Sequence, residues 1–341
     1  MNYSIISKYR TQIMGIAVLW IAILHATMWF PIEPINWLFK ALGQNGVDIF
    51  LFLSSFGLYY SWQRDPDTKN FLKKRFLRII PVFIPVALFR CYYLRYDLFQ
   101  SFLTITALEF WINTGRSVWY ISAIIVLYLI TPIYLKKFEN NERKLTMLSI
   151  VSSFIIGALF FKTGYTVFFC RVPIFFLGFY IGYLAYNQKE ISKFNLVIYI
   201  LMFVVGFGIY RYLFSYVNET LLWDYGLYWY PMFIIIIPFC LFFSYFFSLC
   251  KEYRFPLIND LFHKIGTVSL EFYLLHELMI KIVPNIITVN PYYSAYGIIL
   301  NVVIIFMTYY AAKYYHDTLA YLATVIKDVY GKKKKKVKKE Y

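Results

Sequence analysis

The sequence predicts an all-α membrane protein, a polytopic helical bundle of about ten transmembrane helices with both termini in the cytoplasm. Three observations support this prediction. Of 341 residues, 60% are hydrophobic and only 15% are charged, whereas soluble domains carry about 25% charged residues. The apolar residues gather in runs of about 20, the length that crosses the hydrocarbon core as a helix. The positive charge is divided unevenly among the polar segments between these runs.

The apolar runs give the helices in order. A run of about 20 residues is long enough to span the bilayer, and such runs lie near 11–31, 44–62, 77–96, 117–135, 145–162, 166–187, 195–215, 228–249, 267–287 and 293–315. A shorter apolar segment at 98–112 is expected to lie at the membrane interface or to re-enter the membrane. Residues 1–325 are therefore expected to form one membrane domain, followed by a polybasic cytoplasmic tail at 326–341.

The distribution of charge sets the orientation. With ten spans both termini share one side, and 26 of the 34 Lys and Arg residues fall in segments on that side. The positive-inside rule makes it cytoplasmic, in a multi-pass protein of the cell membrane. The net charge of +16 lies at segment ends rather than along a groove, so nucleic acid is not an expected partner. Seven lysines within 332–339 predict a disordered tail beside anionic lipids, each lysine contributing about 1 kcal/mol.

Polar groups at membrane depth indicate where chemistry takes place. His25 lies deep in the first span, where an ionisable side chain indicates a functional site. Arg10 lies 15 residues earlier, roughly 22 Å away at 1.5 Å per residue, and about 60° around the helix axis, so both can face one lumen. Asp48, near the outer end of the second span, has a depth comparable with that of His25. We expect Asp48 to orient the imidazole, as a carboxylate orients the catalytic base in acyl-transfer enzymes.

Two cations precede the third span. Arg75 and Arg78 share a helix face at the cytoplasmic end, at i and i+3. Guanidinium forks match phosphates. The cations lie at the cytoplasmic side and the imidazole lies deep in the membrane. This arrangement fits a substrate that has an anionic head in the cytoplasm and a reactive end that reaches inward, such as a coenzyme A thioester. Each residue also has a structural interpretation: His25 as a packed helix contact, Asp48 as an N-cap, and the arginines as positive-inside anchors.

Five motifs in order resemble the acyltransferase-3 family of integral membrane acyltransferases. They are the first span with His25, the segment 46–54 (GVDIFLFLS), Arg75 with Arg78, the segment 117–132 (SVWYISAIIVLYLITP), and the segment 266–276 (GTVSLEFYLLH). The resemblance covers nearly the whole chain. The family's arginine eleven residues before the histidine is Met14 here, and Arg10, one turn earlier on nearly the same face, is expected to take its place. The family's Leu-Ser-Gly reads Leu-Ser-Ser, with Ser55 small enough for close helix contact.

The resemblance implies that 1–325 is a membrane acyltransferase domain. It implies an O-acetyltransferase type of enzyme that moves an acyl group, usually acetyl, from cytoplasmic acyl-CoA to a hydroxyl of a glycan, such as an exopolysaccharide, or of a lipid-linked sugar. His25 would be the catalytic histidine, as base or as acyl carrier, while Arg75 and Arg78 hold the donor. Acetyl-CoA, or another acyl-CoA, is the expected donor, and no metal is expected.

Weaker candidates for acceptor contacts lie in later spans. Trp119 and Tyr120, at the outer end of the fourth span, could stack on a sugar or belong to the interfacial aromatic belt. Glu271 and His276, in the ninth span, could contact the acceptor or pair helices. The alternative function is a transporter or flippase for lipid-linked sugars. Against it, we see no matching pair of interrupted spans of the kind that transporter repeats display.

Overall fold

The chain folds around a central helix, α1 (Ser4–His25), in a computed structural model that describes residues 2–25, 43–114, 119–252, 255–286 and 295–337. The regular structure of these residues is helical, apart from one isolated bridge between Asn2 and Glu190. The other helices are α3 (Gly46–Arg64), α4 (Thr68–Tyr93), α5 (Leu98–Ile105), α6 (Glu109–Asn113), α7 (Trp119–Phe138), α8 (Glu142–Leu159), α9 (Thr166–Phe169), α10 (Val172–Tyr186), α11 (Lys193–Tyr216), α12 (Glu219–Asp224), α13 (Tyr230–Glu252), α14 (Pro256–Thr267), α15 (Ser269–Ile286) and α16 (Ala295–Val337).

The all-helical prediction is confirmed for the described residues, and the chain is a membrane protein. Five stretches are helical, long and apolar enough to cross a membrane: Thr68–Tyr93, Trp119–Phe138, Thr166–Tyr186, Lys193–Tyr216 and Tyr230–Glu252. They correspond to five of the ten predicted spans. The count of ten and the side of the termini stay predictions. The ends of predicted spans at 26–31, 117–118, 287 and 293–294 lie outside the described residues.

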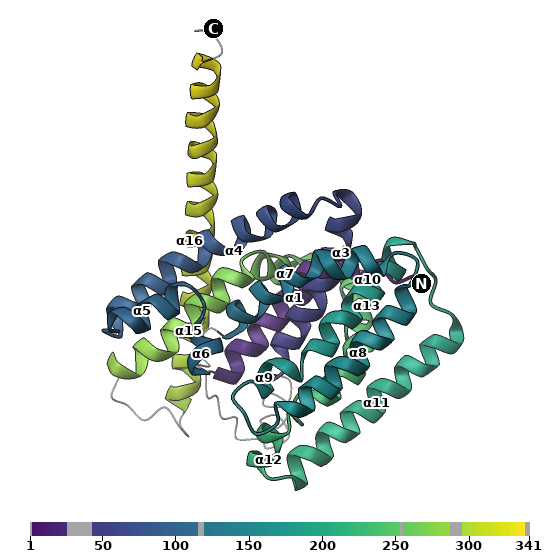
Figure 1. Cartoon of the computed structure of the whole chain (residues 1–341). Coiled ribbons are helices and arrows are strands. Elements are labelled where there is room, and N and C mark those ends of the chain that lie inside the picture. Colours follow the sequence, from purple (N-terminus) through teal and green to yellow (C-terminus); the bar gives the residue numbers. More distant parts are fainter. Residues whose placement is uncertain (1, 26–42, 115–118, 253–254, 287–294, 338–341) are drawn as a thin grey trace.

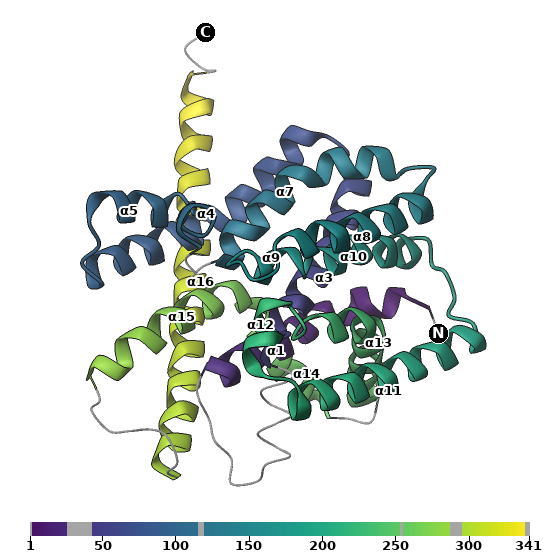
Figure 2. The same cartoon turned by 60° about the horizontal axis from the view of Figure 1, so that its bottom comes forward.

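Close approach of helices around α1 depends on small residues. α1 contacts α3, α10, α13, α14 and α15, and Figures 1 and 2 show it in the middle of these helices. Where α1 meets α14, a Cβ on Gly15 would collide with the carbonyl oxygen of Phe262, and one on Gly266 with that of Thr11. Where α3 meets α10, a Cβ on Gly178 would collide with Ser55. Small residues at such crossings let helix backbones pack tightly in membranes.

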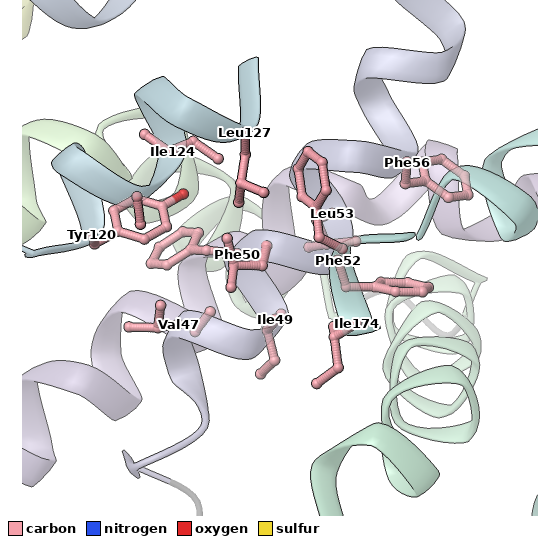
Figure 3. Packing of buried hydrophobic residues seen from close by; sticks show 14 of the residues in the cluster. Val47, Ile49, Phe50, Phe52, Leu53, Phe56, Tyr120, Ile124, Leu127 and Ile174 are labelled. Carbon is pink, nitrogen blue, oxygen red and sulfur yellow. The ribbon is translucent and has the colours of Figure 1, made fainter. Parts of the chain in front are cut away.

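Part of the hydrophobic core lies between α3, α7 and α10. Phe50 and Leu53 of α3 are buried with Ile124 and Leu127 of α7, and Figure 3 shows these side chains together. By contrast, α11 lies at the edge of the bundle with large apolar side chains exposed along it, among them Val204. An apolar surface of this extent on a helix long enough to span a bilayer is suited to contact with lipid.

The apolar segment 98–112 forms two short helices, α5 and α6, and its place at the membrane interface or within the membrane stays a prediction. The C-terminal tail differs from expectation. The tail predicted as disordered is helical as far as Val337, because α16 continues without a break through the lysines. Lysine is a good helix former, and the apolar part of α16 has already nucleated the helix that the lysines extend. Residues 338–341 lie outside the described residues.

Candidate active site

The two ends of α1 carry the first two predicted site residues. Arg10 lies near the start of α1 and His25 is its last residue. The Arg10 guanidinium lies directly against the backbone of Gly57 in α3, where any side chain would displace it. The Nε atom of Arg10 is buried and has no hydrogen-bond partner among the described residues. An unpaired buried donor of this kind is costly unless a ligand satisfies it, so this guanidinium is available to an anion.

The three predicted donor-binding arginines meet around one pocket. Arg10 comes from α1, and Arg75 and Arg78 come from α4 one turn apart. We name this cavity the arginine pocket; its lining is Arg10, Met14, Phe50, Ser54, Leu58, Arg75, Arg78, Ile79, Tyr120, Ile124, Tyr128, Ser269, Leu270 and Tyr273. No carboxylate is among the described residues that line it. Three guanidiniums without an acidic neighbour in the wall make a site for an anion such as a phosphate.

The arginine pocket has neutral polar groups beside its cations. Arg75 donates a hydrogen bond from Nη2 to the Ser61 hydroxyl at 2.5 Å, and its guanidinium lies 5.5 Å from the centre of the Phe71 ring. These contacts hold the side chain toward α3, while its Nε is buried and unpaired among the described residues. Met14 lines the same pocket. Arg10 thus lines the same cavity as the side chain at position 14, and its role in place of the family's arginine stays a prediction.

At the other end of α1, His25 lies against α15. Its Nδ1 is 3.5 Å from Oε1 of Glu277. Its ring stacks on that of His276, with centroids 6.1 Å apart and planes within 11° of parallel. The His25 side chain is 31% exposed and that of Glu277 is 16% exposed, whereas His276 is buried. One face of the His25 ring therefore packs on α15 and its Nδ1 faces Glu277, while about a third of the side chain stays exposed.

Asp48 has a different partner from the one that the sequence suggested. Its carboxylate is fully buried, and Oδ2 lies 3.3 Å from Nε of Arg171, which is 3% exposed. The N-cap position of α3 belongs to Asn45, and Asp48 lies in the first turn. The expected contact between Asp48 and His25 is replaced by two separate pairs, Asp48 with Arg171 and His25 with Glu277. Burial explains this, because a fully buried carboxylate needs a permanent counter-charge.

Arg171 is enclosed on several sides. Its guanidinium lies 4.9 Å from the ring of Trp119 and 4.5 Å from the ring of Trp229, and Nη2 donates to the backbone oxygen of Gln44 at 2.8 Å. Trp119, a predicted sugar-stacking residue, is itself buried and packs on this cation. The arrangement joins α3, α7 and the segment before α10. It is a structural ion pair rather than an open binding site.

The remaining candidates separate into two groups. Tyr120 lines the arginine pocket and packs edge-on against Tyr273 of α15, with centroids 5.6 Å apart. Glu271 pairs with His316 of α16 at 2.8 Å, which is the helix-pairing role foreseen for it. His276 packs on His25 as described above. Their predicted contacts with an acceptor stay predictions.

Sequence reasoning missed Glu277. It directly follows His276 in the chain, but nothing in the spacing of α1 and α15 places it beside His25. A second missed residue is His316, since the apolar pattern around it predicts only a helix end. The only available signal for Glu277 was its own charge within an apolar run, which is the argument that identified His25.

Comparison with known families gives a match over most of the chain. The family model Acyl_transf_3, an acyltransferase domain, matches residues 13–312. The match includes His25, Asp48 and the pair of arginines on α4, together with Glu277. No curated protein matches the chain, and no solved structure does.

Proposed function

The chain belongs to the acyltransferase-3 family and is a membrane acyltransferase, and from this premise we propose its donor and acceptor. The proposed reaction transfers an acetyl group from cytoplasmic acetyl-CoA to a hydroxyl of a cell-surface glycan, such as an exopolysaccharide, or of its lipid-linked precursor. The observation that supports this best is the arginine pocket at one end of the helix whose other end is His25.

The arginine pocket is the proposed site for the phosphates of the donor. Arg10, Arg75 and Arg78 converge there from two helices, and bidentate guanidinium–phosphate contacts are among the strongest hydrogen bonds in proteins. The aromatic wall, which includes Tyr120 and Tyr273, suits the less polar arm that carries the thioester. The charged head thus stays near the cytoplasm while the acyl group reaches inward.

His25 is the proposed catalytic residue. In one form of the reaction it takes the proton of the acceptor hydroxyl as that oxygen attacks the thioester carbonyl; the new C–O bond forms, the C–S bond breaks, and the proton passes to the thiolate of coenzyme A. In the other form an imidazole nitrogen attacks the thioester first, so that an N–C bond forms as the C–S bond breaks and the thiolate of coenzyme A leaves. The hydroxyl then attacks the acyl-imidazole, the C–O bond forms as the N–C bond breaks, and the hydroxyl proton passes to the thiolate. Both forms need a ring nitrogen that is accessible, and the partial exposure of the His25 side chain supports the proposal.

The proposed topology follows from charge. Ten spans with both termini in the cytoplasm put Arg75, Arg78 and the lysine-rich end of α16 on the side where acetyl-CoA is made available. Positive residues favour that side, and the lysines beyond α16's apolar part would lie beside anionic lipids of the cytoplasmic membrane. His25 then lies toward the outer half of the membrane, close to an acceptor that is exported or surface-bound.

Proton NMR of the host's surface polysaccharide tests this function. We expect an O-acetyl signal with the wild-type chain and its loss with His25→Ala, at equal membrane levels. His263→Ala, which removes an exposed histidine from α14, is the matched control and should keep the signal. A double Arg75→Ala, Arg78→Ala variant should regain part of its transfer when acetyl-CoA is raised in membrane vesicles. Unchanged O-acetylation with folded His25→Ala would contradict the proposal.

A further inference from the structure

The carboxylate beside His25 has no assigned role in the reaction described above. Glu277 lies on α15, and its Oε1 is 3.5 Å from Nδ1 of His25. That separation is longer than a formed hydrogen bond. Catalytic hydrogen bonds are often long in enzymes without substrate and shorten when substrate binds. The pair is therefore placed to form a hydrogen bond at the stage when His25 reacts.

The geometry distinguishes the two ring nitrogens of His25. Nδ1 is buried and faces Glu277, while the ring as a whole keeps about a third of its surface exposed. The face of the imidazole is stacked on His276, and this contact limits flipping of the His25 ring. Because a neutral imidazole carries its proton on one nitrogen only, a carboxylate at Nδ1 fixes that proton there and leaves Nε2 with a free lone pair.

Asp48 and Glu109, two buried carboxylates, have partners other than His25. Asp48 is paired with Arg171, and Glu109 accepts a hydrogen bond from the Thr104 hydroxyl at 3.0 Å. Glu277 also lines a small pocket with Arg90 of α4, whose guanidinium supplies positive charge to the same region. A carboxylate with a nearby cation can remain ionised beside a histidine without being an isolated buried charge.

We propose that Glu277 is the positioning residue of this site, holding the Nδ1–H of His25 so that Nε2 reacts with the acceptor hydroxyl or the acyl group. The proposal rests on the function proposed above. In the base form, Nε2 takes the hydroxyl proton as the C–O bond forms and the C–S bond breaks, then returns that proton to the thiolate. The developing imidazolium is stabilised by the Glu277 carboxylate, which keeps its own charge throughout.

The test uses the full-length chain in membrane vesicles, with isotope-labelled acetyl-CoA and label recovered in the glycan fraction. We expect Glu277→Ala to lower the transfer rate about 100-fold, the scale of a general-base contribution. Glu277→Gln keeps a hydrogen-bond acceptor but not the charge, so we expect the transfer rate to fall about 10-fold. Glu277→Asp keeps both and should transfer faster than Glu277→Ala. The KM for acetyl-CoA should stay within about twofold, because Glu277 is not among the residues that line the arginine pocket and a residue that acts only through His25 changes the rate rather than donor binding. Glu109→Gln, which alters a carboxylate that is buried away from His25, is the matched control and should keep the rate.

A double-mutant cycle separates positioning from packing. If Glu277 acts through His25, then adding Glu277→Gln to His25→Ala lowers the residual rate no further, because the two residues work as a unit. A Glu277→Ala protein with the wild-type rate, or rate losses that multiply in the double variant, would overturn the assignment while leaving His25 essential. Retention of transfer in His25→Ala alone would instead overturn the proposed function, so the two failures are distinct.

Discussion

Replacing Arg171 with methionine should destabilise the bundle more than any exposed substitution. The change keeps an unbranched apolar side chain between Trp119 and Trp229 but removes the charge that faces Asp48. The carboxylate then stays fully buried without a counter-charge. Breaking a buried ion pair by removing one member is strongly unfavourable, because the other charge remains desolvated.

The magnitude follows from the geometry. Unit charges 3.3 Å apart, the Nε–Oδ2 distance, attract each other by about 5 kcal/mol at an effective dielectric constant of about 20. Loss of one member of a buried pair typically costs about 3–5 kcal/mol. The lost hydrogen bond to the Gln44 carbonyl acts in the same direction and contributes about 1 kcal/mol. We therefore expect Arg171→Met to lower the free energy of unfolding by about 4 kcal/mol.

Tryptophan fluorescence during unfolding in mixed micelles of dodecyl maltoside and SDS measures this loss. The decisive comparison is Arg171→Met with and without Asp48→Asn. Since a neutral asparagine needs no counter-charge, the double variant should recover the greater part of the stability that Arg171→Met loses. Two results would refute the reasoning: an Arg171→Met protein as stable as the wild type, or a double variant no more stable than Arg171→Met.

Glycine substitutions test two other features of the structure. Gly57→Ala should displace the Arg10 guanidinium, which is the end of a flexible side chain. The KM for acetyl-CoA should then rise about tenfold, because one charge-assisted hydrogen bond is lost. An unchanged KM would mean that Arg10 does not hold the donor. Gly266→Ala places a methyl group against the Thr11 carbonyl, which cannot move independently, and should cost about 1–3 kcal/mol of stability. At Gly208 a Cβ would meet open space, so the unfolding midpoint of Gly208→Ala should equal or exceed the wild-type value. Equal losses of stability in Gly266→Ala and Gly208→Ala would contradict the close-packing argument.

Helix positions were the part of this fold that the sequence could predict. The second predicted span, 44–62, is α3 at Gly46–Arg64, and the seventh, 195–215, is α11 at Lys193–Tyr216. A helix satisfies its own backbone hydrogen bonds, so in a bilayer an apolar run determines its structure without reference to other segments. The i, i+3 spacing of Arg75 and Arg78 likewise needed only local geometry to place both on one face.

Pairing between helices could not be predicted in the same way. Depth alone made Asp48 a plausible partner for His25, because both lie toward the same side of the membrane. Depth gives no lateral position, however, and the partners come from distant segments: Arg171 for Asp48, and Glu277 for His25. Only the packing of α1 against α15, and of α3 against α10, decides which carboxylate meets which base.

The separation of the arginine pocket from His25 along α1 has a physical reason. An anionic donor head cannot enter the apolar part of the membrane without losing its hydration, whereas a neutral thioester can. A helix of 22 residues held by neighbours on several sides keeps the two groups at a fixed spacing of roughly 22 Å. Under the proposed function, the guanidiniums at one end hold the donor's phosphates near water while the imidazole at the other end meets the acyl carbon. On this account the length of α1 between Arg10 and His25 selects donors with a long uncharged arm, and a short acyl phosphate would engage one end of the site but not both.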